Sequence, residues 1–198
     1  MRKLLLLCVV LFSGVVAQAQ IQKGDVQLGG SITYNSNESG GQDNSNFTFS
    51  PQAGLFVSET TSIGVLLGFN STTFNAFNQN NGNLVELTNS LFSFGAYARF
   101  HKSVADNFYL FLQPAVALGT GKVEQINAND VDTNTFLVGV SPGMTYFLSP
   151  KFALELRLGG VNYSRFKTDN NGTENTSTAF SFDMDLASVG LGLNFYIR

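Results

Sequence analysis

Alternation of apolar residues with small or polar ones is the feature that most constrains the fold of this chain. Near its start, Val26, Leu28 and Ile32 are separated by glutamine, glycine and serine. A period of two places successive side chains on opposite faces of a β-strand, so each alternating segment predicts a strand with two different faces. Eight segments of this kind follow one another, at residues 26–34, 47–57, 63–70, 92–100, 108–119, 136–148, 153–159 and 188–198. Most are long enough, at roughly 9–11 residues, to cross a hydrocarbon layer at a tilt.

The last segment contains a change of phase. Phe180 and Phe182 stand at even positions, and Met184 and Leu186 continue that series, whereas the apolar residues from Val189 onward are odd. A β-bulge near residues 187–188 would restore the phase. Alternatively, residues 179–186 form an extension beyond the membrane with its own packing. The sequence leaves both interpretations open.

Composition excludes several other architectures. Charged residues make up only 13% of the 198-residue chain, against roughly 25% in an ordinary soluble domain. Aromatic residues also reach 13%, which argues against disorder. The chain has no apolar run of about 18 residues, the length that a membrane-spanning helix requires. The net charge of −3 offers no basic surface for nucleic acid.

The two strand faces differ in bulk, and this difference indicates which face meets which solvent. One face carries Phe, Leu, Val, Ile and Tyr, and the other carries mainly Gly, Ser, Ala, Thr and Gln. The interior of an eight-stranded barrel barely accommodates its side chains, so a soluble barrel with the bulky face inward would be overfilled. A sheet in lipid must also close, because unpaired backbone groups there are costly. We therefore predict an all-β fold, an eight-stranded antiparallel up-and-down transmembrane β-barrel.

The connections alternate in length. Three are short, around residues 59–61, 101–106 and 149–151, and four are longer and polar, at 36–45, 75–85, 121–133 and 166–177. Short periplasmic turns and long extracellular loops are typical of outer-membrane barrels, and an even strand number places both ends of the barrel on the turn side. Aromatic residues near the strand ends fit interfacial girdles, namely Tyr34, Phe47, Phe69, Phe100, Phe108, Tyr146, Phe152 and Phe195.

The N-terminal segment has the features of an export signal. Arg2 and Lys3 precede an apolar run from Leu4 to Phe12, and Ala17-Gln18-Ala19 matches a small-x-small cleavage pattern. We therefore expect residues 1–19 to be a cleaved signal peptide and residues 20–198 to be a single barrel domain. The one cysteine, at position 8, lies within this leader.

Three stretches carry a resemblance to a known family. They are FGAYARF at 94–100, VSPGMTYFLSPKFALELRLGG at 140–160 and VGLGLNFYIR at 189–198. The chain resembles the small OmpA/OmpX-like outer membrane protein β-barrel (porin-family) proteins of Bacteroidota-type bacteria. The resemblance implies a bacterial outer membrane location, contact with lipid and assembly by the barrel-assembly machinery. One departure is the final Arg198, where such barrels often end in an aromatic residue.

The sequence offers little for catalysis. A rim enzyme would need a general base beside a nucleophile. The only histidine is His101, which we place as a solvated residue on a short periplasmic turn, far from the long loops. We therefore predict no enzymatic activity and no cofactor.

Two loop segments have part of the residue spacing of a calcium-binding loop but lack other required positions. Asp130, Asp132 and Asn134 have the opening spacing of an EF-hand loop, but Thr135 and Ser141 stand where glycine and the closing glutamate are required. Residues 169–172 are similarly incomplete. We expect no metal site.

Three charged residues share the phase of the small face. Arg99, Glu155 and Arg157 should point into the lumen, where a charge requires a partner. We therefore predict that Glu155 pairs with Arg99 or with Arg157. The polar neighbours expected in the same lumen network are Gln52, Gln113, Tyr97 and Tyr163. Such a network would either plug the barrel or form a selectivity constriction.

The predicted barrel is compatible with two classes of function. The first is a structural or surface-interaction barrel, monomeric, whose four long loops contact the medium or another macromolecule. The second is a narrow conduit for small solutes or ions through the Gly- and Ser-rich lumen, although eight strands are few for a diffusion channel. No residue in the sequence identifies an extracellular partner.

Overall fold

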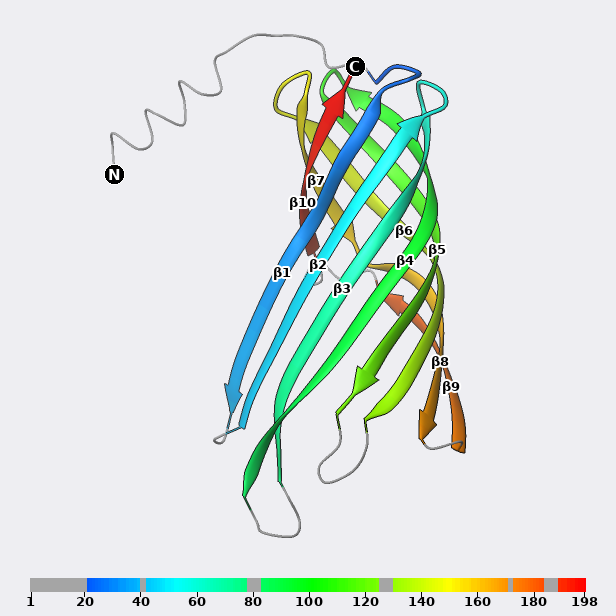
Figure 1. Cartoon of the computed structure of the whole chain (residues 1–198). Helices are drawn as coiled ribbons and strands as arrows, with labels where there is room; N and C mark the ends of the chain where they lie inside the picture. Colours follow the sequence, from blue (N-terminus) through cyan, green and yellow to red (C-terminus); the bar gives the residue numbers. More distant parts are fainter. Residues whose placement is uncertain (1–20, 40–41, 78–82, 125–129, 171–172, 184–188) are drawn as a thin grey trace, which may run out of the picture.

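The computed structural model describes residues 21–39, 42–77, 83–124, 130–170, 173–183 and 189–198. The predicted signal peptide lies outside these ranges. The described residues form antiparallel strands (Figure 1), which are β1 (Val26–Ser39), β2 (Gln42–Phe56), β3 (Thr61–Phe77), β4 (Leu84–Ala105), β5 (Phe108–Val123), β6 (Val131–Phe147), β7 (Phe152–Leu158), β8 (Gly160–Asn170), β9 (Thr173–Asp183) and β10 (Val189–Ile197). No described helix is long and apolar enough to cross a membrane.

Eight of the strands close into a ring at the turn end of the molecule, which confirms the predicted barrel. The order around the ring is β5-β4-β3-β2-β1-β10-β7-β6, and pairing of β5 with β6 completes it. Strands β1 and β10 are joined through five residue pairs, from Val26 with Ile197 to Gly30 with Leu193. Both ends of the barrel therefore lie on the side of the short turns, as predicted (Figure 1).

Towards the loop end, the structure has two strands beyond the eight predicted segments, β8 and β9, which follow β7 and precede β10 in the chain. Strand β6 pairs with β7 near its C-terminal end and with β8 along the rest of its length. The division between β7 and β8 falls at Gly159 and Gly160, which have φ angles of 21° and 153°. A Cβ atom on Gly160 would lie 3.1 Å from the Ser141 Cα atom. Glycine at this position therefore allows the chain to leave β7 and continue as β8.

The change of phase near the C-terminus also has a structural counterpart. Phe180 and Phe182 belong to β9, which pairs with β8, and both are exposed on the outer face. They lie opposite Tyr163 and Val161 of β8. Residues 187–188, where the sequence suggests a β-bulge, lie outside the described ranges.

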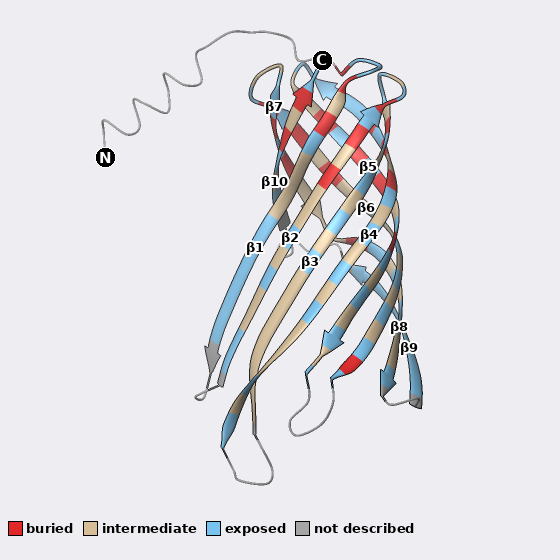
Figure 2. Ribbon diagram, in the orientation of Figure 1, coloured by how far each residue is buried: buried red, intermediate tan, exposed pale blue. Residues whose placement is uncertain are grey.

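The bulky face of the strands points outward, as the argument from steric bulk predicts. Large apolar side chains are exposed on the outer surface all round the ring, and they include Leu28, Leu55, Leu67, Phe94, Leu112, Val138, Leu154 and Leu193. Buried positions concentrate at the turn end of the barrel (Figure 2). This arrangement turns the apolar face toward lipid and the small and polar face toward the lumen.

The strands run further than the alternation of apolar residues predicts. Two of the four segments expected to be long loops, 36–45 and 166–177, are largely strand, because β1 extends to Ser39, β2 begins at Gln42, β8 extends to Asn170 and β9 begins at Thr173. Outside the lipid a strand needs no apolar face, since cross-strand polar contacts can support it. In the lumen, Asn46 Nδ2 donates to Thr72 Oγ1 at 2.8 Å and Asn70 Nδ2 donates to Thr48 Oγ1 at 2.9 Å. The predicted long loops at 36–45 and 166–177 are thus wrong, because these polar segments mostly extend the strands, whereas the centres of the segments at 75–85 and 121–133 lie outside the described residues.

The glycine at the start of β8 provides a test of the fold. Replacing Gly160 with valine should lower the folded yield, because a β-branched residue is strained at this φ angle by about 1–3 kcal/mol and its Cβ atom meets β6. Unboiled and boiled samples on SDS gels report the folded barrel as a band of altered mobility. Val161→Leu, a change of a lipid-facing neighbour, is the matched control. Equal folded fractions for the two variants would contradict this account of the β7–β8 division.

Candidate functional site: a lumen network above an aromatic plug

A buried ion pair lies at the centre of the lumen. Arg99 of β4 is 0% exposed, and its Nη1 atom donates to Glu155 Oε2 of β7 at 2.6 Å. Its Nη2 atom donates to Glu155 Oε1 at 3.1 Å. The contact is therefore bidentate, the geometry in which arginine and carboxylate interact most strongly.

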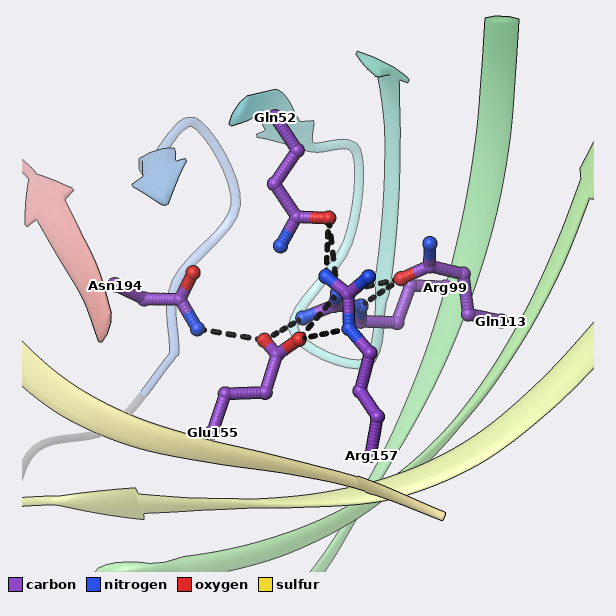
Figure 3. Close-up of polar contacts among 6 residues, drawn as sticks. All are labelled: Gln52, Arg99, Gln113, Glu155, Arg157 and Asn194. Atoms are coloured by element: carbon purple, nitrogen blue, oxygen red, sulfur yellow. Dashed lines mark hydrogen bonds and ion pairs between the residues drawn. The ribbon is translucent and has the colours of Figure 1, made fainter. Parts of the chain in front are cut away.

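A second arginine binds the same carboxylate, so the cluster carries two positive charges and one negative charge (Figure 3). Arg157 Nε donates to Glu155 Oε1 at 2.6 Å, and Arg157 Nη2 donates to Gln52 Oε1 at 2.7 Å. Glu155 thus binds both arginines that the sequence offered as alternatives. The Arg157 side chain remains 32% exposed, whereas Glu155 is almost fully buried.

Amide side chains add further hydrogen bonds to the ionised groups. Gln113 Oε1 accepts from Arg99 Nε at 2.8 Å and also from Arg99 Nη2. Asn194 Nδ2 of β10 donates to Glu155 Oε2 at 2.6 Å, so the two oxygens of this carboxylate accept four hydrogen bonds in all. We define the lumen network as Gln52, Arg99, Gln113, Glu155, Arg157 and Asn194.

Aromatic rings pack against the central guanidinium. The Arg99 Cζ atom lies 4.2 Å from the ring centroid of Phe111 and 5.6 Å from that of Tyr97. The Tyr97 ring is buried against the glycines of β2 and β3, because a Cβ atom on Gly64 would lie only 2.6 Å from Tyr97 Cζ. Small residues on the inner face therefore make room for the few large ones.

Tyr163 lies apart from the network, and its predicted place in the lumen is wrong. Its side chain is 40% exposed on the outer face, in register with Val138 of β6 and Phe180 of β9. The inward position next to it is Asn162, which lies opposite Gly139. Asn194 takes part in the network instead, and its only signal in the sequence is the phase that it shares with Tyr196 in the last strand.

Below the network, the turn end of the lumen is filled by rings. We define the turn-end plug as Phe56, His101, Tyr109, Phe111, Phe147 and Tyr196, which are all buried. Successive ring centroids lie 4.7–6.1 Å apart along the series Tyr109, Phe147, Tyr196, Phe56, His101 and Phe111. Because Phe111 also meets Arg99, the plug and the lumen network form one continuous packed unit.

The position of His101 corrects the sequence prediction. It is not a solvated turn residue, because it belongs to β4, is only 5% exposed, and packs between the rings of Phe56 and Phe111. Strand β4 continues to Ala105, so the turn that follows contains only residues 106–107. The histidine therefore lies inside the barrel, at the end opposite the loops.

The candidate calcium ligands are not arranged as a binding loop. Asp132 and Asn134 lie in β6, where Asp132 is in register with Asp169 of β8. Among the described residues, no group of three or more His, Cys, Asp or Glu side chains could hold a metal ion.

Comparisons with known proteins identify the type of barrel. A family model described as "Outer membrane protein beta-barrel domain" matches residues 4–195. Among solved structures, the chain is similar to Neisserial surface protein A (NspA), with 15% identity over 88% of this chain and 97% of that chain and a TM-score of 0.48. The N-terminal β-barrel domain of Pseudomonas aeruginosa OprF gives 12% identity over 89% and 98% and a TM-score of 0.40. Ail of Yersinia pestis, solved with the heparin analogue sucrose octasulfate, gives 13% over 89% and 100% and a TM-score of 0.42. No curated protein matches the chain.

Removing the central carboxylate should destabilise the barrel strongly. Glu155→Gln leaves two arginines without their shared anion in a buried site, which typically costs about 3–5 kcal/mol. The measurement is the urea midpoint of unfolding in detergent micelles, followed by tryptic protection. Glu59→Gln, in an exposed turn, should leave the midpoint unchanged. Equal midpoints for the two variants would show that the lumen network contributes nothing to stability.

Proposed function

The chain belongs to the outer membrane protein beta-barrel domain family, and we propose that it is a plugged barrel that acts through its loop end rather than as a conduit. It is a bacterial outer-membrane protein, and its wall contacts lipid. The proposal includes export by a cleaved leader at residues 1–19, a single domain at 20–198, assembly by the barrel-assembly machinery and a monomeric state.

The turn-end plug is the observation that carries this proposal. Phe56, Phe147 and Tyr196 are almost completely buried at the turn end of the ring of eight strands, and the lumen network adds a second packed layer above them. A hydrated ion crossing this end would have to pass apolar rings, and apolar constrictions of this kind exclude water. A lumen filled by packed side chains supports a structural role for the membrane-spanning part of the barrel. In this role the barrel holds the loop end on the outer side of the membrane.

Several observations support a non-enzymatic role. The chain has a single histidine, and that residue is part of the plug. The charged residues of the lumen bind one another, because Glu155 accepts four hydrogen bonds and Arg99 donates from its Nε, Nη1 and Nη2 atoms to Gln113 and Glu155. A general base near a free nucleophile is therefore not available in the described lumen.

One observation favours a narrow conduit as the second candidate. The lumen network contains two arginines and one glutamate, and the Arg157 side chain remains partly exposed to the lumen above the plug. A pore formed by movement of the plug would therefore select anions.

Planar-bilayer recording separates the two candidates. We expect the refolded protein to show no steady conductance, whereas the double variant Phe147→Ala/Tyr196→Ala should conduct, because it removes two adjoining rings of the plug. Phe152→Ala, a truncation of a ring on the outer face, is the matched control and should stay closed. A steady anion-selective conductance in the unmodified protein that disappears in Arg157→Gln would overturn the plugged barrel and favour the conduit.

A further inference from the structure

Several buried polar side chains on the inner face of the barrel lack a protein partner. Gln27 of β1 is fully buried, yet neither its Nε2 nor its Oε1 atom has a hydrogen-bond partner within the described part of the chain. The same holds for Gln52 Nε2, Tyr97 Oη and Asn194 Oδ1, whose residues are 6%, 4% and 2% exposed. A polar atom that leaves water without gaining a new partner costs free energy, and nearly all such atoms in folded proteins are paired. These five atoms therefore point to a bound ligand.

Gln27 and Tyr97 approach each other over the β1–β2 pair. Gln27 is in register with Gly54 of β2, and the Cβ positions of directly opposed residues lie about 4.5–5.5 Å apart. A Cβ atom on Gly54 would overlap Tyr97 Oη, so the tyrosine hydroxyl lies over this glycine. Glycine at position 54 thus leaves space beside Gln27, and the hydroxyl projects into it.

Gln52 and Asn194 approach the same place from the loop side. Both are in register with Gly29 of β1, the next inward position after Gln27. A Cβ atom on Gly29 would overlap Asn194 Oδ1, so this oxygen lies over the glycine. The Gln52 amide nitrogen points toward the side of the lumen on which Asn194 lies (Figure 3). We define the inner polar site as Gln27, Gln52, Tyr97 and Asn194.

The chemistry of the unpartnered atoms identifies the ligand. The two amide nitrogens can only donate, the amide oxygens of Gln27 and Asn194 can only accept, and the Tyr97 hydroxyl can do either. A halide ion would leave both amide oxygens unpaired, and a cation would add to the excess positive charge of the lumen network. Water donates and accepts, and a buried water typically makes about three hydrogen bonds to groups that would otherwise be unpaired.

We propose that the inner polar site binds ordered water, about two molecules, and that this water links β1 to the lumen network. Strand β1 contributes none of the six side chains of that network, although β1 and β10 close the ring. Bridging through water gives β1 a polar contact across the lumen in addition to its backbone pairing with β10. The inference goes beyond the proposed function, because bound water supports the closing strand whether or not the barrel conducts.

The sign of a stability change tests the site. Gln27→Met keeps the approximate length of the side chain and removes both of its polar atoms. If Gln27 had no ligand, this change would leave the urea midpoint unchanged or raise it, because a buried unpaired amide would be lost. We expect a lower midpoint, because the bound water loses a donor and an acceptor. Gln22→Met, at an exposed position before β1, is the matched control and should leave the midpoint unchanged.

A milder variant keeps this test independent of side-chain packing. Tyr97→Phe removes one oxygen and keeps the ring beside Arg99. It should also lower the midpoint, whereas Tyr146→Phe, which removes the same atom from an exposed ring on the outer face, should have no effect. A midpoint that is unchanged or raised in both Gln27→Met and Tyr97→Phe would overturn the site.

Magnetic relaxation dispersion of the water oxygen counts long-lived waters directly. In the full chain refolded in detergent micelles, Gln27→Met should lose about two such waters relative to the unmodified protein and to Gln22→Met. Equal numbers in all three proteins would overturn the proposal.

A change of salt distinguishes water from an anion. We expect the unmodified protein and Gln27→Met to respond alike when sodium gluconate replaces sodium chloride at equal ionic strength. A chloride-dependent midpoint that Gln27→Met abolishes would show an anion in the site, which also overturns the proposal. Each of these results is independent of bilayer conductance, which tests the plugged barrel by itself.

Discussion

Every strand of this barrel must find partners for its backbone on both sides wherever lipid surrounds it, because the bilayer offers no hydrogen bonds. The five residue pairs between β1 and β10 meet this requirement at the turn end, where they join the first and last strands of the chain. A ring of eight strands is narrow, and its diameter decides what the lumen can contain. Small inward residues and a few packed large ones are the consequence.

Within that narrow lumen, the charged residues bind one another and the amide side chains around them. Residues of five different strands converge on one carboxylate or its arginine partners, and the resulting contacts connect positions as distant in sequence as Gln52 and Arg157. A buried ion pair alone is a weak source of stability, since desolvation offsets its attraction. Here the hydrogen bonds from Arg99 to Gln113 and from Asn194 to Glu155, together with the ring of Phe111 against Arg99, offset this cost, and they fix the relative positions of the strands.

Alternation of apolar residues predicts the strands of the wall well, because a strand between lipid and lumen turns every second side chain toward lipid. It predicts Arg99, Glu155 and Arg157 as inward for the same reason. It fails for Phe56, Phe111 and Phe147, since the plug places bulky rings on the inner face and removes the contrast between the faces. It fails for Tyr163 because one extra residue, between the register of Gly143 with Arg157 and that of Val140 with Val161, reverses the phase of β8.

The two ends of the barrel are stabilised in different ways. At the turn end, closure of the backbone forces a small lumen, and the rings of the turn-end plug pack within it. Towards the loop end, polar side chains on the inner face contact one another across neighbouring strands, as Asn46 and Thr72 do. The glycines at 159 and 160 redirect the chain from β7 into β8, which continues the wall along β6. The lumen therefore changes along its length from packed rings and a buried ion network to polar contacts between strands.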